Sequence, residues 1–254
     1  MCGRFFMWQP PEIYRLFYGY PEQPNFPPRY NVAPTQPVPV VVAEGGERHF
    51  RLMRWGFWPG WLKDPKDFPL VINARVETVA EKPSFRGALR HRRCIFLADG
   101  FYEWRREGTG RAAKRSPFMI RRADGAPMAL AGLWETWASA DGSEVDTAAI
   151  VTTGANGVLA AVHDRMPAIL SPDAVADWLD TRGVDSGPAA ALCRPCPEQW
   201  LTLDPVGSRV NDARNDDADL IVPVGRPQPA SPPIGQDAAE TPRSSDEDAQ
   251  GALF

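Results

Sequence analysis

Short apolar runs separated by Gly, Pro or Asp recur along the first 153 residues of the chain. Runs of this length and spacing, rich in Val, Ile and aromatic residues, are typical of β-strands. They predict eight strands, at residues 38–43, 49–55, 70–72, 94–98, 101–105, 117–121, 128–137 and 147–153. So many strands imply an antiparallel or mixed sheet system.

Helical spacing of apolar residues is rare in this sequence. Ile13, Leu16 and Phe17 follow a pair of prolines at intervals of three and four, which predicts a short helix. Residues 171–173, Ser-Pro-Asp, supply a capping hydroxyl, a proline at the first helical position and an early acid, so a second helix is predicted over 174–179. Strands and helices do not alternate regularly, which argues against a doubly wound nucleotide-binding fold. We predict an α+β fold with a mostly antiparallel or mixed β-sheet core and a few short helices.

The last part of the chain differs in composition from the rest. From Gly225 onward it holds five prolines, several small polar residues and an acidic cluster at residues 246–248, with little that could be buried. We therefore predict one folded domain over residues 1–224 and a disordered, proline-rich acidic tail over residues 225–254.

Length and composition exclude several classes of protein. The chain has 254 residues, 43% of them hydrophobic and 24% charged, as in ordinary globular proteins. No apolar run approaches the roughly 18 residues that a membrane-spanning helix needs. The apolar residues 5–8 are too few for the core of a secretory signal, which takes about 7–15. We expect a cytoplasmic protein.

The net charge of −4 hides an asymmetry along the chain. Residues 1–122 carry 21 Lys and Arg against 11 Asp and Glu, whereas the remaining residues carry 7 against 21. Of the 28 basic residues, 24 are arginines, whose planar guanidinium groups suit bidentate contact with phosphate. This composition fits either a phosphate-bearing partner or a genome that favours arginine codons.

The second residue of the chain is a cysteine. Removal of the initiator methionine would expose a terminal amine, with a pKa of about 7.7–8.0, beside a thiol with a pKa of about 8.5. An aldehyde can form an imine with the amine of Cys2 and then accept the thiol at the same carbon, which closes a five-membered thiazolidine ring. No internal cysteine or lysine can form this ring. The alternative is that the codon after the start is a cysteine by chance.

Three further islands carry side chains that suit such a site. Asn73 and Arg75 place an amide and a guanidinium directly after the apolar residues 70–72. Glu103 lies between aromatic residues, where desolvation would raise its pKa toward neutrality. His163 opens the segment His-Asp-Arg-Met-Pro. Each island alone is more often structural than catalytic.

The other cysteines offer no further chemistry by their pattern. Four cysteines are too few for a disulfide scaffold in a chain of this length. Cys193 and Cys196 form a CxxC pair without a second pair or nearby histidines, so we reject a zinc site and expect no metal and no cofactor. The pair also lacks the βαβ context of a thioredoxin-like motif. Cys94, within an apolar strand, is predicted to be a core residue.

Several longer motifs, taken together, resemble one known family over about residues 2–222. In order along the chain they are MCGRF at the start, WGFWPGW at 55–61, INARVET at 72–78, RRCIFLADGFYEW at 92–104, AGLWE at 131–135, VHDRMPAIL at 162–170 and VNDARNDD at 210–217. These motifs resemble the SOS-response-associated peptidase (SRAP) family. The resemblance implies a barrel-like fold and a bacterial, nucleoid-associated sensor of abasic sites in single-stranded DNA.

The resemblance also implies roles for individual residues. Cys2 matches the nucleophile that crosslinks to the abasic sugar, and Asn73 matches the residue that positions it. Glu103 matches an acid/base residue that also helps to release Met1, which accounts for the word peptidase, and His163 matches the residue near the sugar hydroxyl. Strand scission by β-elimination and reversal of the crosslink are implied as well, with Glu103 and His163 as proton carriers.

For DNA binding, the resemblance implies arginines near the phosphates, a glycine that allows close approach of the backbone, and tryptophans that stack on bases. The matching residues are Gly3, Arg4, Arg75, Arg86 and Arg165, with Trp55 and Trp61 as the stacking candidates and Trp58 as a further one. Such contacts predict sequence-tolerant binding that weakens with salt. The basic run at residues 90–93 is either part of this surface or a helix end.

Two other function classes remain open from the residues alone. The chain could bind single-stranded DNA through its arginines and tryptophans without a covalent step. It could also be a cysteine peptidase acting on other proteins, with Cys2, His163 and either Asn73 or Asp164 in a triad-like arrangement. No feature of the sequence requires more than a monomer.

Overall fold

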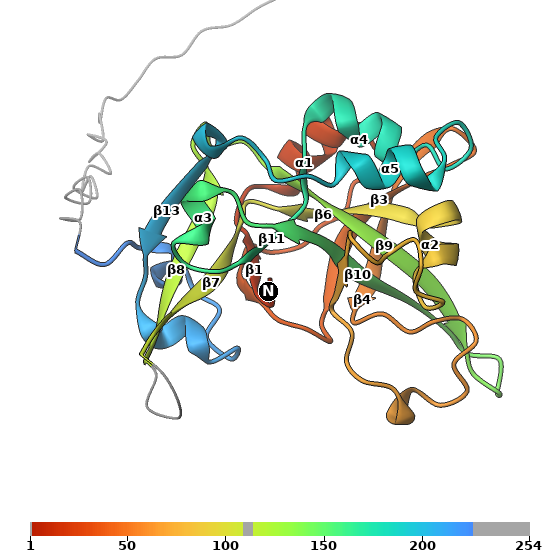
Figure 1. The fold of residues 1–254 in the computed structure, drawn as a ribbon, viewed down its shortest axis with the longest axis horizontal. Helices are drawn as coiled ribbons and strands as arrows, with labels where there is room; N and C mark the ends of the chain where they lie inside the picture. Colours follow the sequence, from red (N-terminus) through yellow and green to blue (C-terminus); the bar gives the residue numbers. More distant parts are fainter. Residues whose placement is uncertain (1, 109–113, 226–254) are drawn as a thin grey trace, which may run out of the picture. The chain divides into compact units, whose positions relative to one another are not determined.

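The computed structural model describes residues 2–108 and 114–225 (Figure 1). Residues 1–224 form one compact unit. The predicted tail lies outside the described residues apart from Gly225 and stays a prediction. Within the described ranges, every helix is too short or too polar to cross a bilayer.

Five strands close into a small barrel. The hydrogen-bonded ring runs β4–β3–β6–β9–β10 and back to β4, because β10 pairs with both β9 and β4. All pairs in the ring are antiparallel except β10 with β4. The barrel strands are β3 (Pro37–Glu44), β4 (Glu47–Trp55), β6 (Arg93–Ala98), β9 (Met128–Ala138) and β10 (Glu144–Gly154).

Three short strands extend this sheet. β5 (Asn73–Arg75) runs parallel to β10, β11 (Arg165–Pro167) runs antiparallel to β10, and β12 (Ile169–Leu170) pairs with β9. The pairing of β5 and β11 with β10 places two of the motif segments, Asn73–Arg75 and Arg165–Pro167, against a single strand of the barrel wall.

A second, five-stranded antiparallel sheet lies beside the barrel. Its order is β13–β8–β7–β1–β2, with β1 (Phe5–Met7), β2 (Arg29–Val32), β7 (Gly100–Glu107), β8 (Lys114–Arg122) and β13 (Leu201–Pro205). Only Asp99 separates β6 of the barrel from β7 of this sheet. The Asp99 carboxylate accepts hydrogen bonds from the backbone N–H groups of Trp8 and Gln9 and from the Tyr14 hydroxyl, which holds the junction to the start of the chain.

Within residues 2–108 and 114–225, five short helices surround the sheets. α1, α4 and α5 lie along the upper edge in Figure 1, while α2 lies beside β9. Their bounds are α1 (Pro11–Tyr18), α2 (Arg86–His91), α3 (Gly157–Ala160), α4 (Pro172–Leu179) and α5 (Ser186–Leu192). One-turn 3₁₀ helices occur at Pro65–Asp67, Glu198–Trp200, Ser208–Asn211 and Ala218–Ile221.

The core fills the barrel and the space between it and the helices. Trp55, Phe96 and Ile150 are fully buried, and Phe5 from β1 packs its ring 5.2 Å from that of Trp55. Gly132 on β9 leaves room for a neighbouring ring, since a Cβ there would lie 2.6 Å from the Phe96 side chain. A smaller cluster on the other face of the five-stranded sheet contains Phe6, Tyr102 and Met119.

The predicted α+β class with a mixed, barrel-like sheet is confirmed, as are both predicted helices and seven of the eight predicted strands. The Ser171 hydroxyl caps α4 by accepting from the Ala174 N–H, as its position in the sequence indicates. The prediction of a strand at residues 70–72 is wrong, because the strand is Asn73–Arg75 itself. Leu70 is 52% exposed, and Val71 and Ile72 are only partly buried against the core.

The basic run at residues 90–93 is a helix end. α2 ends at His91, and Arg93 at the start of β6 is fully buried. Its guanidinium donates hydrogen bonds to the carbonyls of Asp180 and Val184, which ties the loop between α4 and α5 to the barrel. Cys94, which follows, is a fully buried core residue as predicted.

Candidate active site

Cys2 lies between the two sheets, just before β1 (Figure 1). Its side chain is fully buried. The Asn73 side-chain amide donates a hydrogen bond of 2.9 Å to the Cys2 carbonyl oxygen. Two residues 71 positions apart in the sequence are therefore in direct contact.

The short strand β5 explains the orientation of Asn73. Its register opposite β10 pairs Asn73 with Ile150 and Ala74 with Val151. Ala74 is buried, and because side chains alternate along a strand, Asn73 and Arg75 share the opposite face. The Asn73 Oδ1 atom is buried and has no hydrogen-bond partner among the described residues, which leaves it as an acceptor for a bound molecule.

Glu103 approaches Cys2 from the five-stranded sheet. The Tyr102 N–H donates a hydrogen bond of 2.9 Å to the Arg4 carbonyl. Glu103, the next residue of β7, therefore lies beside the residues that precede Arg4. Glu103 is 2% exposed, and burial raises the pKa of its carboxyl. Burial also raises the pKa of the Cys2 thiol, and the nearby Glu103 charge adds to this effect. The carboxyl and the thiol are thus electrostatically coupled.

His163 is half-buried in the turn that follows α3. Its Nδ1 accepts a hydrogen bond of 3.0 Å from the Arg165 N–H, which leaves the proton of the neutral ring on Nε2. The exposed Asp164 carboxylate also lies 2.8 Å from this Nδ1. A positive charge on His163 lowers the pKa of Glu103, an effect smaller than that of burial.

A cavity of about 620 Å³ opens beside His163. It is lined by Arg75, Glu77, Thr78, His163, Asp164 and Arg165. Its polar, charged lining suits a sugar-phosphate chain better than an apolar ligand. Among the sequence-predicted residues, the structure thus brings Cys2, Asn73 and Glu103 together, with His163 electrostatically coupled to Glu103.

The four predicted phosphate-binding arginines differ in their surroundings. Arg75 and Arg86 are exposed. Arg165 instead forms a bidentate ion pair with Glu77 at 2.5 and 2.9 Å and also donates to the Thr152 carbonyl. Arg4 donates to Asn31 Oδ1 and to the Val210 carbonyl, at 2.7 and 2.8 Å. The guanidinium groups of Arg4 and Arg165 are therefore already hydrogen-bonded within the protein. Those of Arg75 and Arg86 face solvent. Gly3, beside Arg4, is half-buried.

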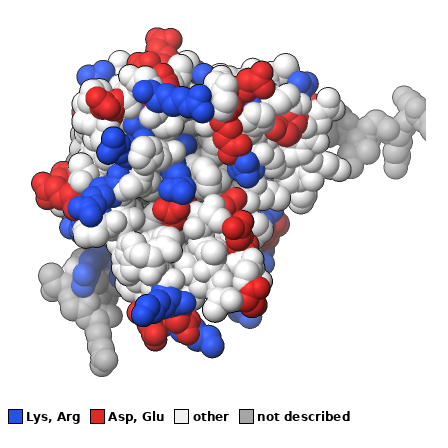
Figure 2. Space-filling view, turned by 90° about the vertical axis from the view of Figure 1, so that its right-hand side faces the viewer, with Lys and Arg blue, Asp and Glu red and all other residues white. Residues whose placement is uncertain are grey.

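On the face of the molecule drawn in Figure 2, the charged residues do not form one continuous basic surface. Figure 2 shows Lys and Arg interleaved with Asp and Glu on the face at the right of Figure 1. The excess of basic residues in the first half of the sequence is thus partly neutralised by neighbours in space, as Arg92 is by Glu135.

The stacking prediction needs a correction at Trp55. This side chain is fully buried, and its indole N–H donates to the Ile72 carbonyl at 3.1 Å, so no face is open to a base. Trp58 is half-buried, and the guanidinium of Arg54 lies over its ring. Trp61 is 61% exposed and is the member of this motif with a free face.

Arg75 also lines a second cavity, which no sequence motif predicted. Its apolar wall comes from Phe57, Phe68 and Phe85, which lie on three separate segments. No short motif joins these residues, so only the folded chain could reveal the cavity. Cys193 and Cys196 are both buried. In the described part of the chain, no group of three or more His, Cys, Asp or Glu residues could hold a metal ion.

Comparison with known sequences gives one consistent result. A profile of the family described as SOS response associated peptidase (SRAP) matches residues 1–213. The abasic site processing protein YoqW of Bacillus subtilis (strain 168) is 36% identical over 225 residues, which cover 87% of this chain and 99% of that protein. The abasic site processing protein YedK of Escherichia coli (strain K12) is 36% identical over 233 residues, covering 88% and 100%.

Solved structures agree with the fold. A protein from Bacteroides thetaiotaomicron superposes with a TM-score of 0.77 at 24% identity, covering 87% of this chain and 98% of that one. A protein from Bordetella bronchiseptica has a TM-score of 0.69 at 26% identity, covering 81% and 100%. The overall fold therefore recurs in other proteins.

Proposed function

Because the chain belongs to the SOS response associated peptidase family, we propose that it processes abasic sites in single-stranded DNA by trapping the sugar aldehyde on Cys2. The adduct would be a thiazolidine formed after removal of Met1. The observation that carries this proposal is the 2.9 Å hydrogen bond from Asn73 to the Cys2 carbonyl, which fixes the second residue of the chain beside a buried glutamate.

The chemistry balances without a cofactor. Hydrolysis of the bond between Met1 and Cys2 adds one water molecule and frees the amine. This amine adds to the aldehyde carbon of the ring-opened sugar, and one water leaves as the imine forms. The thiol then adds across the carbon–nitrogen double bond, with sulfur bonding to carbon and the proton passing to nitrogen. The product is a five-membered ring.

The surroundings of Glu103 support its role in proton transfer. A carboxyl with a raised pKa keeps its proton to a higher pH than an exposed glutamate and can give that proton to the departing water. Burial keeps the Cys2 thiol protonated, so ring closure needs a base, and the Glu103 carboxylate is close enough to affect that thiol. The same carboxyl is the candidate for assisting Met1 removal.

The partner in this proposal is single-stranded DNA. Arg75 and Arg86 offer exposed guanidinium groups for phosphates, and Trp61 offers a face for a base. Arg4 and Arg165 would contact phosphates only by sharing or exchanging their present partners. We also propose that the protein acts as a monomer, in the cytoplasm at the bacterial nucleoid.

Cleavage of the strand and reversal of the adduct belong to the same proposal. In the imine state, loss of a proton from the adjacent sugar carbon leads to β-elimination of the phosphate. Reopening of the ring requires a proton on sulfur and a water at carbon. Glu103 and the Nε2–H of His163 are the groups that we propose for these transfers.

The buried thiol argues against a cysteine peptidase that acts on other proteins. Such enzymes use a thiolate, which needs a lowered pKa, whereas burial raises the pKa of Cys2. Binding of DNA without a covalent step remains the competing function, and the test below separates the two.

The test uses a single-stranded oligonucleotide with one abasic site, followed by denaturing electrophoresis. The wild-type protein should give a retarded band without any reductant, and Cys2→Ala should give none. Cys2→Ser keeps the amine but lacks the thiol, so its imine should be retained only after borohydride reduction. Cys196→Ala serves as the matched control and should behave as wild type.

Two outcomes would contradict the proposal. One is a heat-stable band of wild-type intensity with Cys2→Ala, which would place the bond elsewhere. The other is an intact mass that retains Met1 on protein that is fully active, since an acylated amine cannot close the ring.

A further inference from the structure

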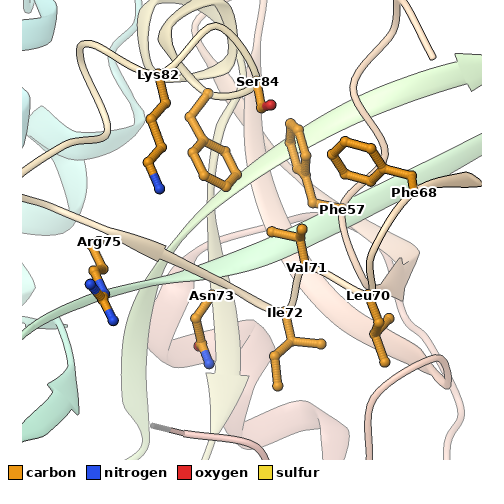
Figure 3. A pocket seen from close by; sticks show the side chains of 10 residues that line it. Phe57, Phe68, Leu70, Val71, Ile72, Asn73, Arg75, Lys82 and Ser84 are labelled. Carbon is orange, nitrogen blue, oxygen red and sulfur yellow. The ribbon is translucent and has the colours of Figure 1, made fainter.

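A second cavity, which we call the aromatic cavity, lies next to the proposed trapping site. It has a volume of about 450 Å³, within the range of roughly 300–1,000 Å³ that small-molecule sites occupy. Figure 3 shows the rings of Phe57 and Phe68 at one end, and the cationic groups of Lys82 and Arg75 at the other. The residues that line it are Phe57, Phe68, Leu70, Val71, Ile72, Asn73, Arg75, Lys82, Ser84 and Phe85.

The walls of the aromatic cavity are fixed by hydrogen bonds of the backbone. The Phe57 N–H donates to the Val71 carbonyl at 2.8 Å, and the Ile72 carbonyl accepts from both the Trp55 indole and the Ile150 N–H. The Phe57 and Phe85 rings lie 5.2 Å apart. These contacts join the segment at residues 70–72 to the barrel, so the cavity is already formed in the free protein.

The aromatic cavity shares a lining residue with the proposed trapping site. Asn73 lines it, and the same side chain holds the Cys2 carbonyl. Arg75 lines both this cavity and the polar cavity beside His163. A sugar bound at Cys2 would therefore place an adjoining nucleotide at the mouth of the aromatic cavity.

The lining indicates which part of that nucleotide would enter. Phe68, Leu70, Val71 and Ile72 are partly or largely exposed and offer apolar contacts that suit a nucleobase, whereas Phe57 and Phe85 are buried. Lys82 and Arg75, both exposed at one end, suit the phosphate of the same nucleotide. We propose that the aromatic cavity binds the unpaired base of a nucleotide adjacent to the abasic sugar. This inference rests on the proposed function and assigns the cavity a substrate contact.

A physical consequence distinguishes this contact from the reaction at Cys2. An abasic site has no base of its own, so the enzyme must hold the strand through the nucleotides on either side of that site. Stacking of one base on apolar side chains changes affinity by about tenfold. Removing the neighbouring base should therefore weaken binding but leave the bond-forming residues intact.

The test compares three single strands that each contain one abasic site at the same position. The first has natural bases on both sides, and the second and third carry a tetrahydrofuran spacer as the 5′ or the 3′ neighbour. With DNA below saturation, wild-type trapping should slow about tenfold for one of the two spacer strands. Leu70→Ala and Phe68→Ala should slow on the natural strand and lose this difference between strands.

Leu52→Ala is the matched control, because Leu52 is 59% exposed on β4 and does not line the cavity. It should retain the wild-type preference. Leu70 is itself 52% exposed, so its replacement should leave folding intact, and thermal unfolding of each variant checks this.

Equal wild-type rates on all three strands would overturn the proposal, as would a preference that survives in both cavity variants.

Equilibrium binding by fluorescence anisotropy separates a failure of this proposal from a failure of the proposed function. For this measurement each strand has a tetrahydrofuran in place of the abasic sugar, so no covalent step occurs. A base-dependent affinity that Leu70→Ala removes supports the cavity even if no adduct forms, and its absence contradicts the cavity even if adducts do form.

Discussion

At the scale of single residues, Glu103 shows how burial prepares a side chain for chemistry and lowers stability at the same time. Its carboxyl is almost completely enclosed, and its pKa lies above the ordinary value of 4.5. An ionised carboxylate in such surroundings is destabilising, because desolvation disfavours the charged form. Glu103 nevertheless lies where it can transfer protons in the proposed reaction.

Glu103→Gln should separate these two effects. A folded-state pKa above 4.5 means that the unfolded state gives up the proton more readily, so stability falls as the pH rises from about 4.5 through the folded-state value. Gln carries no charge and escapes this loss. We expect the difference in melting temperature, variant minus wild type, to be more positive at pH 8 than at pH 4. Thermal unfolding of both proteins at each pH measures this difference.

The same variant should trap abasic DNA more slowly, by about a hundredfold, since it can neither give nor take a proton. Rates are measured by denaturing electrophoresis at fixed pH. A melting difference that is the same at both pH values would contradict the desolvation argument, and an unchanged rate would remove Glu103 from the mechanism.

At the scale of elements, the position of Glu103 depends on the close packing of β7 between β1 and β8. Gly100, three residues earlier, pairs with Phe6 on one side and Arg121 on the other. A Cβ there would lie 2.3 Å from both the Phe6 ring and the Ile120 carbonyl oxygen. Contact at that distance cannot be relieved without moving a strand.

Gly100→Ala should therefore destabilise the protein by about 1–3 kcal/mol, as overpacked cores do, and slow the trapping reaction because β7 carries Glu103. Gly154→Ala is the matched control, since no atom lies within 4 Å of the Cβ that it adds to β10. Urea unfolding measures both. If the two substitutions cost the same, the packing of β7 against β1 is looser than the distances indicate.

At the scale of the whole molecule, the two sheets converge on the first residues of the chain, and residues 1–224 contain every part of the proposed site. The sequence of residues 225–254 adds acidic residues and prolines but none of the site residues. Binding to DNA by the remaining part should depend on its arginines and weaken with salt.

Deletion of residues 225–254 should leave trapping of abasic DNA within about twofold of the full chain, because removal of a few acidic charges is a weak, salt-screened effect. The measurement is the trapping rate of both proteins at low and at physiological salt. A large loss of activity on deletion would show that the tail takes part in the reaction.

The sequence by itself determined the barrel strands and the helices at Pro11–Tyr18 and Pro172–Leu179, and it named the residues that we propose for the site. Apolar runs and caps act over a few neighbouring positions, so their signal is local. It missed β1, β2, β11, β12 and β13, and it placed a strand at residues 70–72 instead of Asn73–Arg75. Those strands are two to five residues long, and they form because a partner strand is present rather than because of their own pattern.

Only the tertiary structure decided which of the predicted side chains are available. It buried Trp55, paired Arg165 with Glu77 and joined Arg4 to Asn31, while it left Arg75 and Trp61 exposed. It also assembled the aromatic cavity from separate segments. The physical reason is the same in each case: exposure and pairing depend on contacts between residues that are distant in the sequence, and these contacts exist only after the sheets have packed together.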